Sequence, residues 1–458
     1  MTREQCLVLP FMVTLNPDQI RWVWHPEARV VEGQRVERFP RSLSLARFPT
    51  ELINQLDGAG IPFFSPADPP SAWPRPVLRI FRQLSGEGFI GLVFGPPENP
   101  LLGWWDGDYT EEKRKNAALP EWIWVEDVQL RRDGGRLYIE APGVAGRLQW
   151  FDPEHGETLL NLLRENNLKA GEVRGGLPAL FAWAGFLRSP GEAAPPPVGA
   201  PHDRMFHWKW RLSGHGEARG AWYPGARAGR PVPPPHPAEA EGPGRVNLPW
   251  ITDTDQMTFD QVLAARKSVR EHRKTGLSLA QIGSFFARGF GQREPEDEEA
   301  GDERMATLRR SYPSAGGLHE IDCFLHLRRS EDVPVGLYYY DPAGHGLIPI
   351  PDSPARLTQI VRLGEGASEF AGRATAQIFL FARMDRLNWK YEGMAYALAL
   401  QNTGACLHSL YLAAAATGLG ICAIGNGDDR FLKDCPVLTG QSRWWVGHLL
   451  LGVHGDDP

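Results

Sequence analysis

Two proline-rich stretches divide the chain, and they constrain its fold more than any other feature. The first, SPGEAAPPPVGAP, covers residues 189–201, and the second, RPVPPPHPAEAEGPGR, covers residues 230–245. Proline fixes φ and lacks the backbone N–H that helices and inner strands need, so neither stretch suits the interior of an element. We therefore expect extended connectors between an N-terminal half and a C-terminal half that begins near Asn247.

The composition is that of a chain that buries a core. Hydrophobic residues make up 42% and charged residues 23% of 458 residues, and 49 Lys+Arg against 55 Asp+Glu give a net charge of −6. These values exclude a wholly disordered chain, and the acidic balance argues against blanket neutralisation of nucleic-acid phosphates. Because no uninterrupted apolar run reaches the length of a bilayer-spanning helix, we expect neither nucleic acid nor a membrane as a partner.

The cysteines indicate the compartment. There are five, with no CxxC spacing, and an odd number does not suit a complete disulfide framework. We expect no structural disulfides, no metal site and a reducing cytoplasm. The N-terminal apolar stretch is too short for a signal-peptide core followed by a cleavage site.

The N-terminal half contains two weakly similar units, each with strands, then helices, then a closing Gly-Phe-apolar triplet. In the first unit the strand-like runs CLVLPFMVTL and IRWVWH precede the helical patterns SLARFPTELINQLDGAG and PVLRIFRQLSGEGFIGLVFG. In the second, the hairpin VQLRRDGGRLYIEAP turns at Gly134-Gly135, and helices follow over HGETLLNLLREN and GGLPALFAWAGFL. This order of elements is typical of small winged-helix units.

Such units have three uses. They can bind DNA, they can be purely structural, or an exposed strand edge can take up an extended peptide. The stretch LPALFAWAGF carries no charge, which disfavours DNA binding. We expect winged-helix-like units at residues 1–118 and 119–190, a linker region with an aromatic docking segment at 191–246, and a catalytic domain at 247–458.

The C-terminal half mixes helical and strand patterns. Amphipathic helices are expected within residues 257–274 and 277–291, and a long buried helix within 391–418. Strands are expected at residues 321–329, 375–384 and 444–455, with a hairpin at 335–350 and a further helix at 355–364. The fold class is therefore α+β, with a sheet flanked by helices.

Three motifs in this half suit the binding of a phosphorylated, flat ligand. Arg266, Ser268 and Arg270 place two guanidiniums and a hydroxyl on one helical face, although a solvated basic helix end would look the same. The small residues of Tyr312–Leu318 allow close backbone approach, although an ordinary turn is the alternative. The glycine-punctuated stretch Thr417–Gly427 follows a helix, so it is not a dinucleotide-binding fingerprint.

The fourth motif is the pair Lys390-Tyr391, which we expect at the start of the long helix. A lysine whose pKa is lowered by desolvation, or a tyrosine whose pKa is lowered by a neighbouring ammonium, could accept a proton. The alternative is a surface lysine beside a half-buried tyrosine.

Together the four motifs resemble those of the FMN-dependent nitroreductase superfamily. They resemble most its SagB-type dehydrogenase branch, the azoline oxidases of ribosomally made, thiazole- and oxazole-modified peptides. The resemblance covers roughly residues 247–458 and touches Phe206-His207. More loosely, the N-terminal units resemble the leader-peptide recognition domains of cyanobactin-type oxidases. The resemblance implies a nitroreductase-like fold with a central mixed or antiparallel sheet.

The resemblance also implies an FMN-dependent homodimer with the cofactor at the subunit interface. One subunit would hold the phosphate and pyrimidine edge, and the turn near residue 314 of the other would contact the flavin. The family's C-terminal basic pair is missing from GVHGDDP, and Arg443 is the candidate replacement. The implied cofactor-binding residues are Arg266, Ser268, Arg270, Pro313, Ser314, Ala315, Gly316, Ile424, Gly425 and Arg443.

The implied chemistry needs a base. An azoline ring becomes aromatic when its Cα–H leaves as a proton and its ring CH₂ gives a hydride to the flavin, with oxygen as final acceptor. We take Tyr391, activated by Lys390, as the first candidate base and Lys390 itself as the second. The implied partners are a precursor peptide and a cyclodehydratase.

Other functions remain open on the same scaffold. An NAD(P)H-dependent nitro- or ene-reductase needs the FMN motifs but not the Lys-Tyr pair or the N-terminal half. An FMN oxidase could act on another peptide or small-molecule bond. A non-enzymatic recognition or scaffolding protein would keep the fold and bind no flavin.

Overall fold

The computed structural model divides the chain into two compact units, Met1–Arg219 and Gly220–Pro458, and each is described by itself. The division falls within residues 191–246, the expected linker region. None of the described helices has the length and hydropathy of a bilayer-spanning segment. The structure describes residues 20–24, 30–31, 35–36, 61–62, 90–94, 102–104, 121–133, 136–144, 147–150, 156–165, 167–169, 181–182, 184–191, 199–210, 220–221, 223–237, 243–250, 257–294, 305–351, 358, 374–425 and 442–454.

The first unit is built on a seven-stranded sheet in the order β4-β1-β5-β6-β10-β9-β8, and all its pairings are antiparallel. A three-stranded sheet, β11-β7-β12, and the pair β2-β3 complete its described strands. The bounds are β1 Ile20–Trp24, β2 Val30–Val31, β3 Arg35–Val36, β4 Ile61–Pro62, β5 Ile90–Phe94, β6 Leu102–Trp104, β7 Glu121–Trp124, β8 Gln129–Asp133, β9 Arg136–Glu140, β10 Leu148–Trp150, β11 Asn167–Lys169, β12 Leu187–Arg188, α4 Gly156–Arg164 and α6 Pro201–Trp210.

Several expectations for this unit can be checked. The hairpin strands β8 and β9 and the helix α4 are confirmed, while Gly134-Gly135 lies outside the described residues. The prediction that a helix ends at Gly88-Phe89-Ile90 is wrong at that end, because Ile90–Phe94 forms strand β5, which pairs with β1 and β6. The run IGLVF pairs on both sides, and this pairing outweighs its helical pattern. The winged-helix assignment stays a prediction, and β6–β10 pairing joins strands of both expected units.

The second unit is a seven-stranded sheet in the order β13-β18-β17-β16-β19-β21-β20. All its pairings are antiparallel, so of the two expected sheet types the antiparallel one is present. The bounds are β13 Val246–Asn247, β14 Gln292–Glu294, β15 Arg309–Arg310, β16 Ile321–Leu327, β17 Gly336–Asp341, β18 Gly346–Ile350, β19 Ala376–Arg383, β20 Leu419–Ile424, β21 Arg443–Val453, α7 Pro224–Arg227, α8 Phe259–Ala265, α9 Leu279–Gly289, α11 Met384–Lys390 and α12 Ala395–Ala416.

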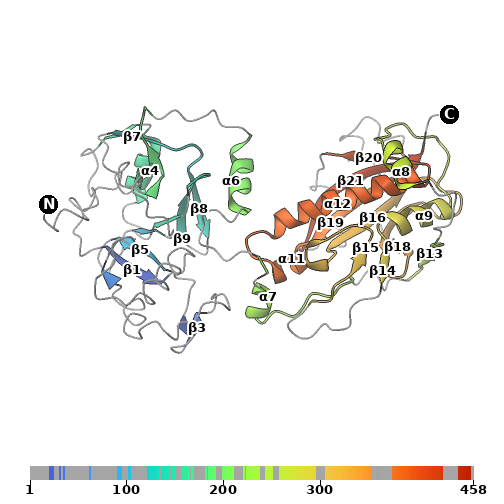
Figure 1. Ribbon diagram of the computed structural model, residues 1–458, viewed down its shortest axis with the longest axis horizontal. Helices are drawn as coiled ribbons and strands as arrows, with labels where there is room; N and C mark the ends of the chain where they lie inside the picture. The colour runs from blue at the N-terminus through green and yellow to red at the C-terminus, as the bar shows by residue number, and fades with distance from the viewer. Residues whose placement is uncertain are drawn as a thin grey trace. The chain divides into compact units, whose positions relative to one another are not determined.

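Alternation along the strands gives this sheet two buried faces. On β16, Cys323 and Leu325 join the large cluster that contains residues of α9 and α12, whereas Phe324 joins a second cluster with Tyr339 and Phe381. Successive side chains of a strand point to opposite faces, so the two clusters lie on opposite sides of the sheet. Figure 1 shows α12 lying along the sheet with α9 beside it.

The ends of the helices set the position of the site. Helices α8 and α9 begin with capping boxes at Thr258 and Ser278, whose side chains accept hydrogen bonds from backbone N–H groups of the first turn. The long helix ends where Gly418 takes a φ of 69°, as expected. It begins at Ala395, however, because a separate short helix, α11, precedes it. The helix expected at 355–364 lies outside the described residues, apart from residue 358.

One buried histidine makes the stability of this unit depend on pH. His448 is 2% exposed, its Nε2 lies 3.0 Å from Gln377 Oε1, and its ring stacks on Phe379. Burial lowers the pKa of His448 from 6.5 to about 4. Between these values the unfolded chain binds a proton that the folded chain does not, so His448 makes stability fall as the pH falls through this window.

We expect His448→Gln to remove this contribution. The dependence of the unfolding free energy on pH between 4 and 6.5 should become less steep by up to about 1.4 kcal/mol per pH unit. Denaturant unfolding of both proteins across this window measures it, and the comparison cancels the titration of groups common to both. Parallel curves would show that His448 does not titrate as described.

Candidate functional site

The Arg266–Arg270 segment follows α8 rather than lying on it. The helix ends at Ala265, and Arg266 is already extended, with φ −62° and ψ 114°. The expectation of one helical face is therefore wrong, because the Val269 N–H bonds to Ile421 O of β20 and holds the chain extended. Arg266, Ser268 and Arg270 are exposed on this segment, whereas Val269 is buried.

A tyrosine of the long helix ties this segment to β20. Tyr411 Oη lies 3.1 Å from Ser268 Oγ and accepts a 2.7 Å hydrogen bond from the Ala423 N–H. The Arg266 guanidinium lies 5.7 Å from the Tyr411 ring centroid. Ile424 is half-buried, and a side chain at Gly425 would meet open space. These contacts join Arg266 and Ser268 through Tyr411 to Ala423, which Ile424 and Gly425 follow in the chain, and the charge of Arg270 acts on Cys422 of the same strand. We call Arg266, Ser268, Arg270, Ile424 and Gly425 the basic cluster.

A network of hydrogen bonds holds the turn that follows Tyr312. Ser314 Oγ donates to Glu320 Oε2 over 3.0 Å, and the Ala315 N–H donates to Asn402 Oδ1 over 3.1 Å. Asn402 Nδ2 closes the network with a 2.9 Å bond to Glu320 Oε1. Glu320 has no exposed surface, and burial raises its pKa. The polar groups of Ser314 and Ala315 thus hold the turn in place, while Pro313 and Gly316 are its exposed members.

The Lys390-Tyr391 pair lies over this turn. Lys390 ends α11 and its Nζ donates to Gly316 O over 3.4 Å. A Cβ placed on Gly316 would lie 2.4 Å from Lys390 Nζ and 2.5 Å from Tyr391 Oη. Because Gly316 also has a φ of +58°, a side chain at this position would be strained and would displace the ends of both approaching side chains. We call Gly316, Lys390 and Tyr391 the amine–phenol cluster.

The two proton-bearing groups of this cluster are shifted in opposite directions. Burial lowers the pKa of Lys390, and the positive charge of Arg386 lowers it further. Burial raises the pKa of Tyr391, and Tyr223 and Glu320 raise it further. The lowered pKa of Lys390 agrees in direction with the desolvated lysine expected from the sequence, whereas the raised pKa of Tyr391 is opposite in direction to the expected activation of the phenol. Both base assignments stay predictions.

Arg443 lies in a buried ion pair. Its Nε donates to Asp322 Oδ2 over 2.9 Å, and the two side chains are 8% and 3% exposed. It is the first residue of β21, whereas His448, the partner of Ile424, is five residues further along, or about 17 Å. The phosphate contact of Arg443 stays a prediction, and its guanidinium already has a partner in the chain.

One helix sets the spacing of the two clusters. Asn402 contacts the turn and Tyr411 contacts the basic cluster, and nine residues of α12 separate them, or about 13 Å. The roles of Asn402, Glu320 and Tyr411 were not predicted from the sequence, because none of the three residues belongs to a recognisable motif. Their role follows only from their hydrogen bonds.

The donors of the two clusters fit a flavin mononucleotide. Arg266 and Arg270 are exposed, and within the described residues no carboxylate lies at ion-pairing distance from either, so their guanidiniums suit a phosphate. The exposed Gly425, with open space where a Cβ would lie, leaves room for a flat ring near β20. These are the groups that the family resemblance implied for binding FMN.

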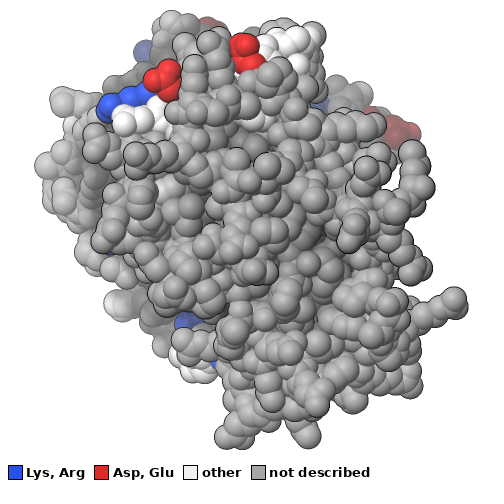
Figure 2. All heavy atoms as spheres, turned by 90° about the vertical axis from the view of Figure 1, so that its left-hand side faces the viewer, with Lys and Arg blue, Asp and Glu red and all other residues white. Residues whose placement is uncertain are grey.

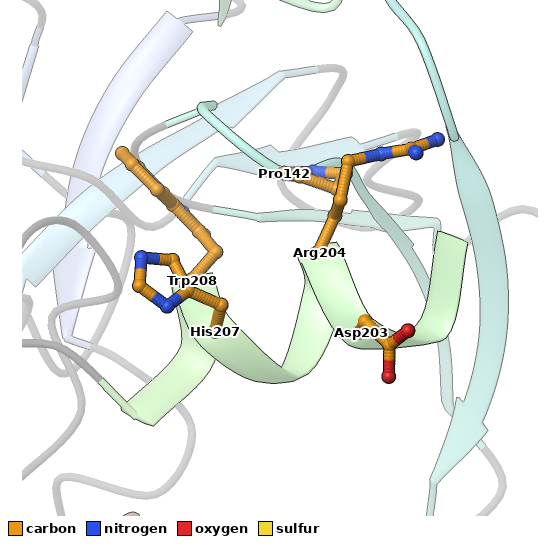
Figure 3. Close-up of a pocket in the computed structure, with 5 residues that line it drawn as sticks. All are labelled: Pro142, Asp203, Arg204, His207 and Trp208. Atoms are coloured by element: carbon orange, nitrogen blue, oxygen red, sulfur yellow. The ribbon is translucent and has the colours of Figure 1, made fainter. Parts of the chain in front are cut away.

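The first unit has a pocket of its own. A cavity of about 350 Å³ is lined by four residues of α6, namely Asp203, Arg204, His207 and Trp208, and by Pro142 after β9 (Figure 3). Lys209 of the same helix forms a 2.6 Å ion pair with the buried Glu140, whose pKa is lowered by its basic partners despite its burial. On the face in Figure 2 only a few described acidic and basic side chains are visible, and some of them lie near its upper edge.

Sequence comparison identifies the catalytic half. Residues 263–452 match the model of the nitroreductase family, so this region is a nitroreductase-family domain with mixed helix and sheet content. A Methanocaldococcus jannaschii protein described as a nitroreductase is 23% identical over 184 residues, which are 40% of this chain and 86% of that protein. The microcin B17-processing protein McbC of Escherichia coli is 27% identical over 152 residues, 32% of this chain and 51% of McbC.

The similarity of this chain to solved structures has low TM-scores. A nitroreductase-like protein of Ralstonia eutropha has a TM-score of 0.38 and 23% identity, over 50% of this chain and 95% of that one. A chain of the E. coli microcin synthetase McbBCD complex with truncated pro-MccB17 has a TM-score of 0.35 and 19% identity, over 58% of this chain and 100% of that one. The present chain spans about half the length of McbC. The family match supports an oxidoreductase, and members of the nitroreductase family generally use FMN.

We expect Tyr411→Phe to weaken the binding of FMN about tenfold, because the Ser268 hydroxyl and the Ala423 N–H both lose their partner. Titration of the apoprotein with FMN, followed by flavin fluorescence, measures the affinity. The matched control is Tyr338→Phe on β17, which loses a 2.6 Å hydrogen bond from the Tyr338 hydroxyl to Pro334 O. Equal affinities of wild type and Tyr411→Phe would exclude a role for Tyr411 at the basic cluster.

Proposed function

We propose that this protein is an FMN-dependent azoline oxidase that converts thiazoline or oxazoline rings of a ribosomally made peptide to thiazole or oxazole. The observation that carries the proposal is the amine–phenol cluster, in which Lys390 Nζ lies 3.4 Å from Gly316 O and both side chains crowd Gly316. The similarity to McbC, a microcin B17-processing protein, supports a peptide substrate. A nitroreductase-family domain alone would not require this pair.

The chain's residues have distinct tasks in this proposal. Bound FMN would supply the redox chemistry by accepting a hydride from the ring CH₂. Lys390, whose pKa burial and the charge of Arg386 lower, takes the proton from Cα in its neutral form. Tyr391, whose raised pKa keeps it protonated, donates a hydrogen bond and orients the ring. Arg266, Ser268 and Arg270 hold the phosphate end.

Assigning the proton to Lys390 reverses the order of bases expected from the sequence. Activity should then rise with pH through the pKa of Lys390, which lies below the ordinary value of 10.5, because only the neutral amine can accept a proton. If Tyr391 were the base, its raised pKa would leave little phenolate near neutral pH. The two assignments therefore predict different effects of substitution.

We expect Lys390→Met to lower turnover on the order of 10²-fold or more, and Tyr391→Phe to lower it less, with flavin absorption unchanged in both. The assay incubates each protein with an azoline-bearing peptide and oxygen and follows the loss of two hydrogens per ring by mass spectrometry. A wild-type protein that holds FMN but leaves the peptide mass unchanged would refute the proposed function. Unchanged turnover in Lys390→Met would refute the base assignment alone.

A reductase is the second candidate, favoured by the match that covers 86% of the M. jannaschii protein described as a nitroreductase. Such an enzyme would bleach its flavin rapidly with NAD(P)H and would not need Lys390. The proposed oxidase needs no nicotinamide, because oxygen reoxidises the flavin. The same purified protein therefore distinguishes the two.

We also propose that two copies of the chain form the working enzyme. Only Val262 of α8 is buried, whereas Phe259 is 68% and Leu263 41% exposed. On the adjoining α12, Tyr396 and Leu400 are exposed as well. A short helix that shows this much apolar surface needs a partner, and a second copy would cover it beside the basic cluster. A precursor peptide and a cyclodehydratase remain the proposed further partners.

We expect Phe259→Glu to shift the protein from dimer to monomer, because a carboxylate would be buried in the proposed interface without a partner. Light scattering coupled to size exclusion gives the mass. Val335→Glu, at a residue that is 66% exposed before β17, is the control and should leave the mass unchanged. A wild-type monomer, or a Phe259→Glu dimer of wild-type stability, would contradict the interface.

A further inference from the structure

The end of the expected aromatic docking segment and the start of the second expected connector are attached along α11. We call Gly220 and residues 223–237 the strap. Gly220 and Glu392 exchange two backbone hydrogen bonds, and the Tyr223 N–H donates to Lys390 O over 3.0 Å. Trp389 Nε1 donates to Arg230 O over 3.1 Å. The strap therefore contacts the C-terminal end of α11 at the residues that carry the chemistry.

The proline part of the strap is bonded to two arginines at the other end of α11. Arg386 Nη1 donates to Pro233 O over 3.0 Å, and Arg383 donates to Pro234 O over 2.8 Å and to Pro235 O over 3.2 Å. The segment is extended, as its prolines predict, and its carbonyls have buried guanidiniums as donors. Both arginines are at most 5% exposed, so these bonds are costly to break.

The strap also approaches α11 more closely than a side chain would allow. A Cβ on Gly225 would lie 2.1 Å from Trp389 Cδ1, and the Tyr223 ring meets the Trp389 ring edge-on at 5.9 Å. Tyr223 takes a left-handed φ of 54°, which costs a non-glycine residue on the order of 1 kcal/mol or more. Its ring centroid lies 6.0 Å from Lys390 Nζ. The packing thus fixes an aromatic ring beside the amine.

Arg386 reaches the opposite side of the site as well. Its Nη2 donates to Leu318 O over 3.1 Å and to Ala306 O over 3.4 Å. Leu318 closes the turn that carries Gly316, and Lys390 lies one helical turn after Arg386. One buried guanidinium therefore joins the strap, α11 and the turn.

We propose that the strap is a working part of the site, which holds Lys390 and Tyr391 against Gly316, with Arg386 as the positioning residue that joins the three segments. This inference rests on the proposed function for its catalytic consequence, though not for its structural one. The groups that face Lys390 are Arg386 on its own helix, Tyr223 of the strap, Tyr391, and the Gly316 carbonyl of the turn. Glu320 lies behind Tyr391.

The first test displaces the strap without touching the site. Gly225→Ala forces the strap away from Trp389, whereas Gly229→Asn, the matched control, adds a side chain in open space at a φ of +64° that asparagine tolerates. With flavin bound in both, we expect kcat of Gly225→Ala on an azoline peptide to fall about tenfold or more, KM to change little, and Gly229→Asn to match wild type. Wild-type kcat in a folded Gly225→Ala would overturn the proposal.

The second test needs no substrate. Acetic anhydride acetylates only the neutral amine, so the extent of acetylation of the Lys390 peptide against pH, measured by mass spectrometry on the holoenzyme, reports the state of Lys390. Displacing the strap exposes the amine to water, and we expect the midpoint to move to higher pH in Gly225→Ala but not in Gly229→Asn. Equal midpoints would overturn the proposal even if no azoline oxidation is found.

Arg386→Lys is the second variant, and it serves also if Gly225→Ala does not fold. It keeps the positive charge, but an ammonium cannot span the carbonyls of Pro233, Leu318 and Ala306 as a guanidinium does. We expect a lower kcat with flavin retained, and wild-type kcat would overturn the role of Arg386. The control is Arg245→Lys, because Arg245 forms an ion pair with Asp341 at the end of β17 and does not contact α11 or the turn.

Discussion

The buried guanidinium of Arg386 is the contact on which the catalytic half depends. A fully buried positive charge is costly unless it finds acceptors, and here backbone carbonyls from three segments accept from its two Nη atoms. These acceptors are carbonyls and not carboxylates, although the charges of Asp385 and Glu320 also act on the guanidinium. Burial lowers the pKa of Arg386 itself to about 10, and its charge acts on Lys390, one turn away.

One helix holds both clusters in place. Asn402 of α12 contacts the turn and Tyr411 of α12 contacts the basic cluster, so this helix sets the distance between the two clusters. The basic cluster lies beside α8, which shows most of its surface in a single chain.

Local patterns predicted the elements better than the site. Apolar runs in the sequence predicted β16, β19 and the β17–β18 hairpin, and Gly418 correctly predicted the end of the long helix. The extended form of Arg266–Arg270 was missed because its cause, the bond from Val269 to Ile421, joins residues far apart in sequence. For the same reason composition alone could not show that prolines would bond to buried arginines.

The candidate site shows the same limit. Adjacent Lys390 and Tyr391 were visible in the sequence, but their shifts depend on Arg386, Tyr223 and Glu320, which no spacing connects to them. The sequence therefore singled out the pair, and the directions of the two pKa shifts led us to propose Lys390 as the base.

The most direct test of the central claim is the flavin spectrum of the purified protein under anaerobic conditions. Addition of an azoline-bearing peptide, with no nicotinamide present, should bleach the flavin bands, and admitting oxygen should restore them. A spectrum unchanged by the peptide but bleached by NAD(P)H would contradict the account and identify a reductase.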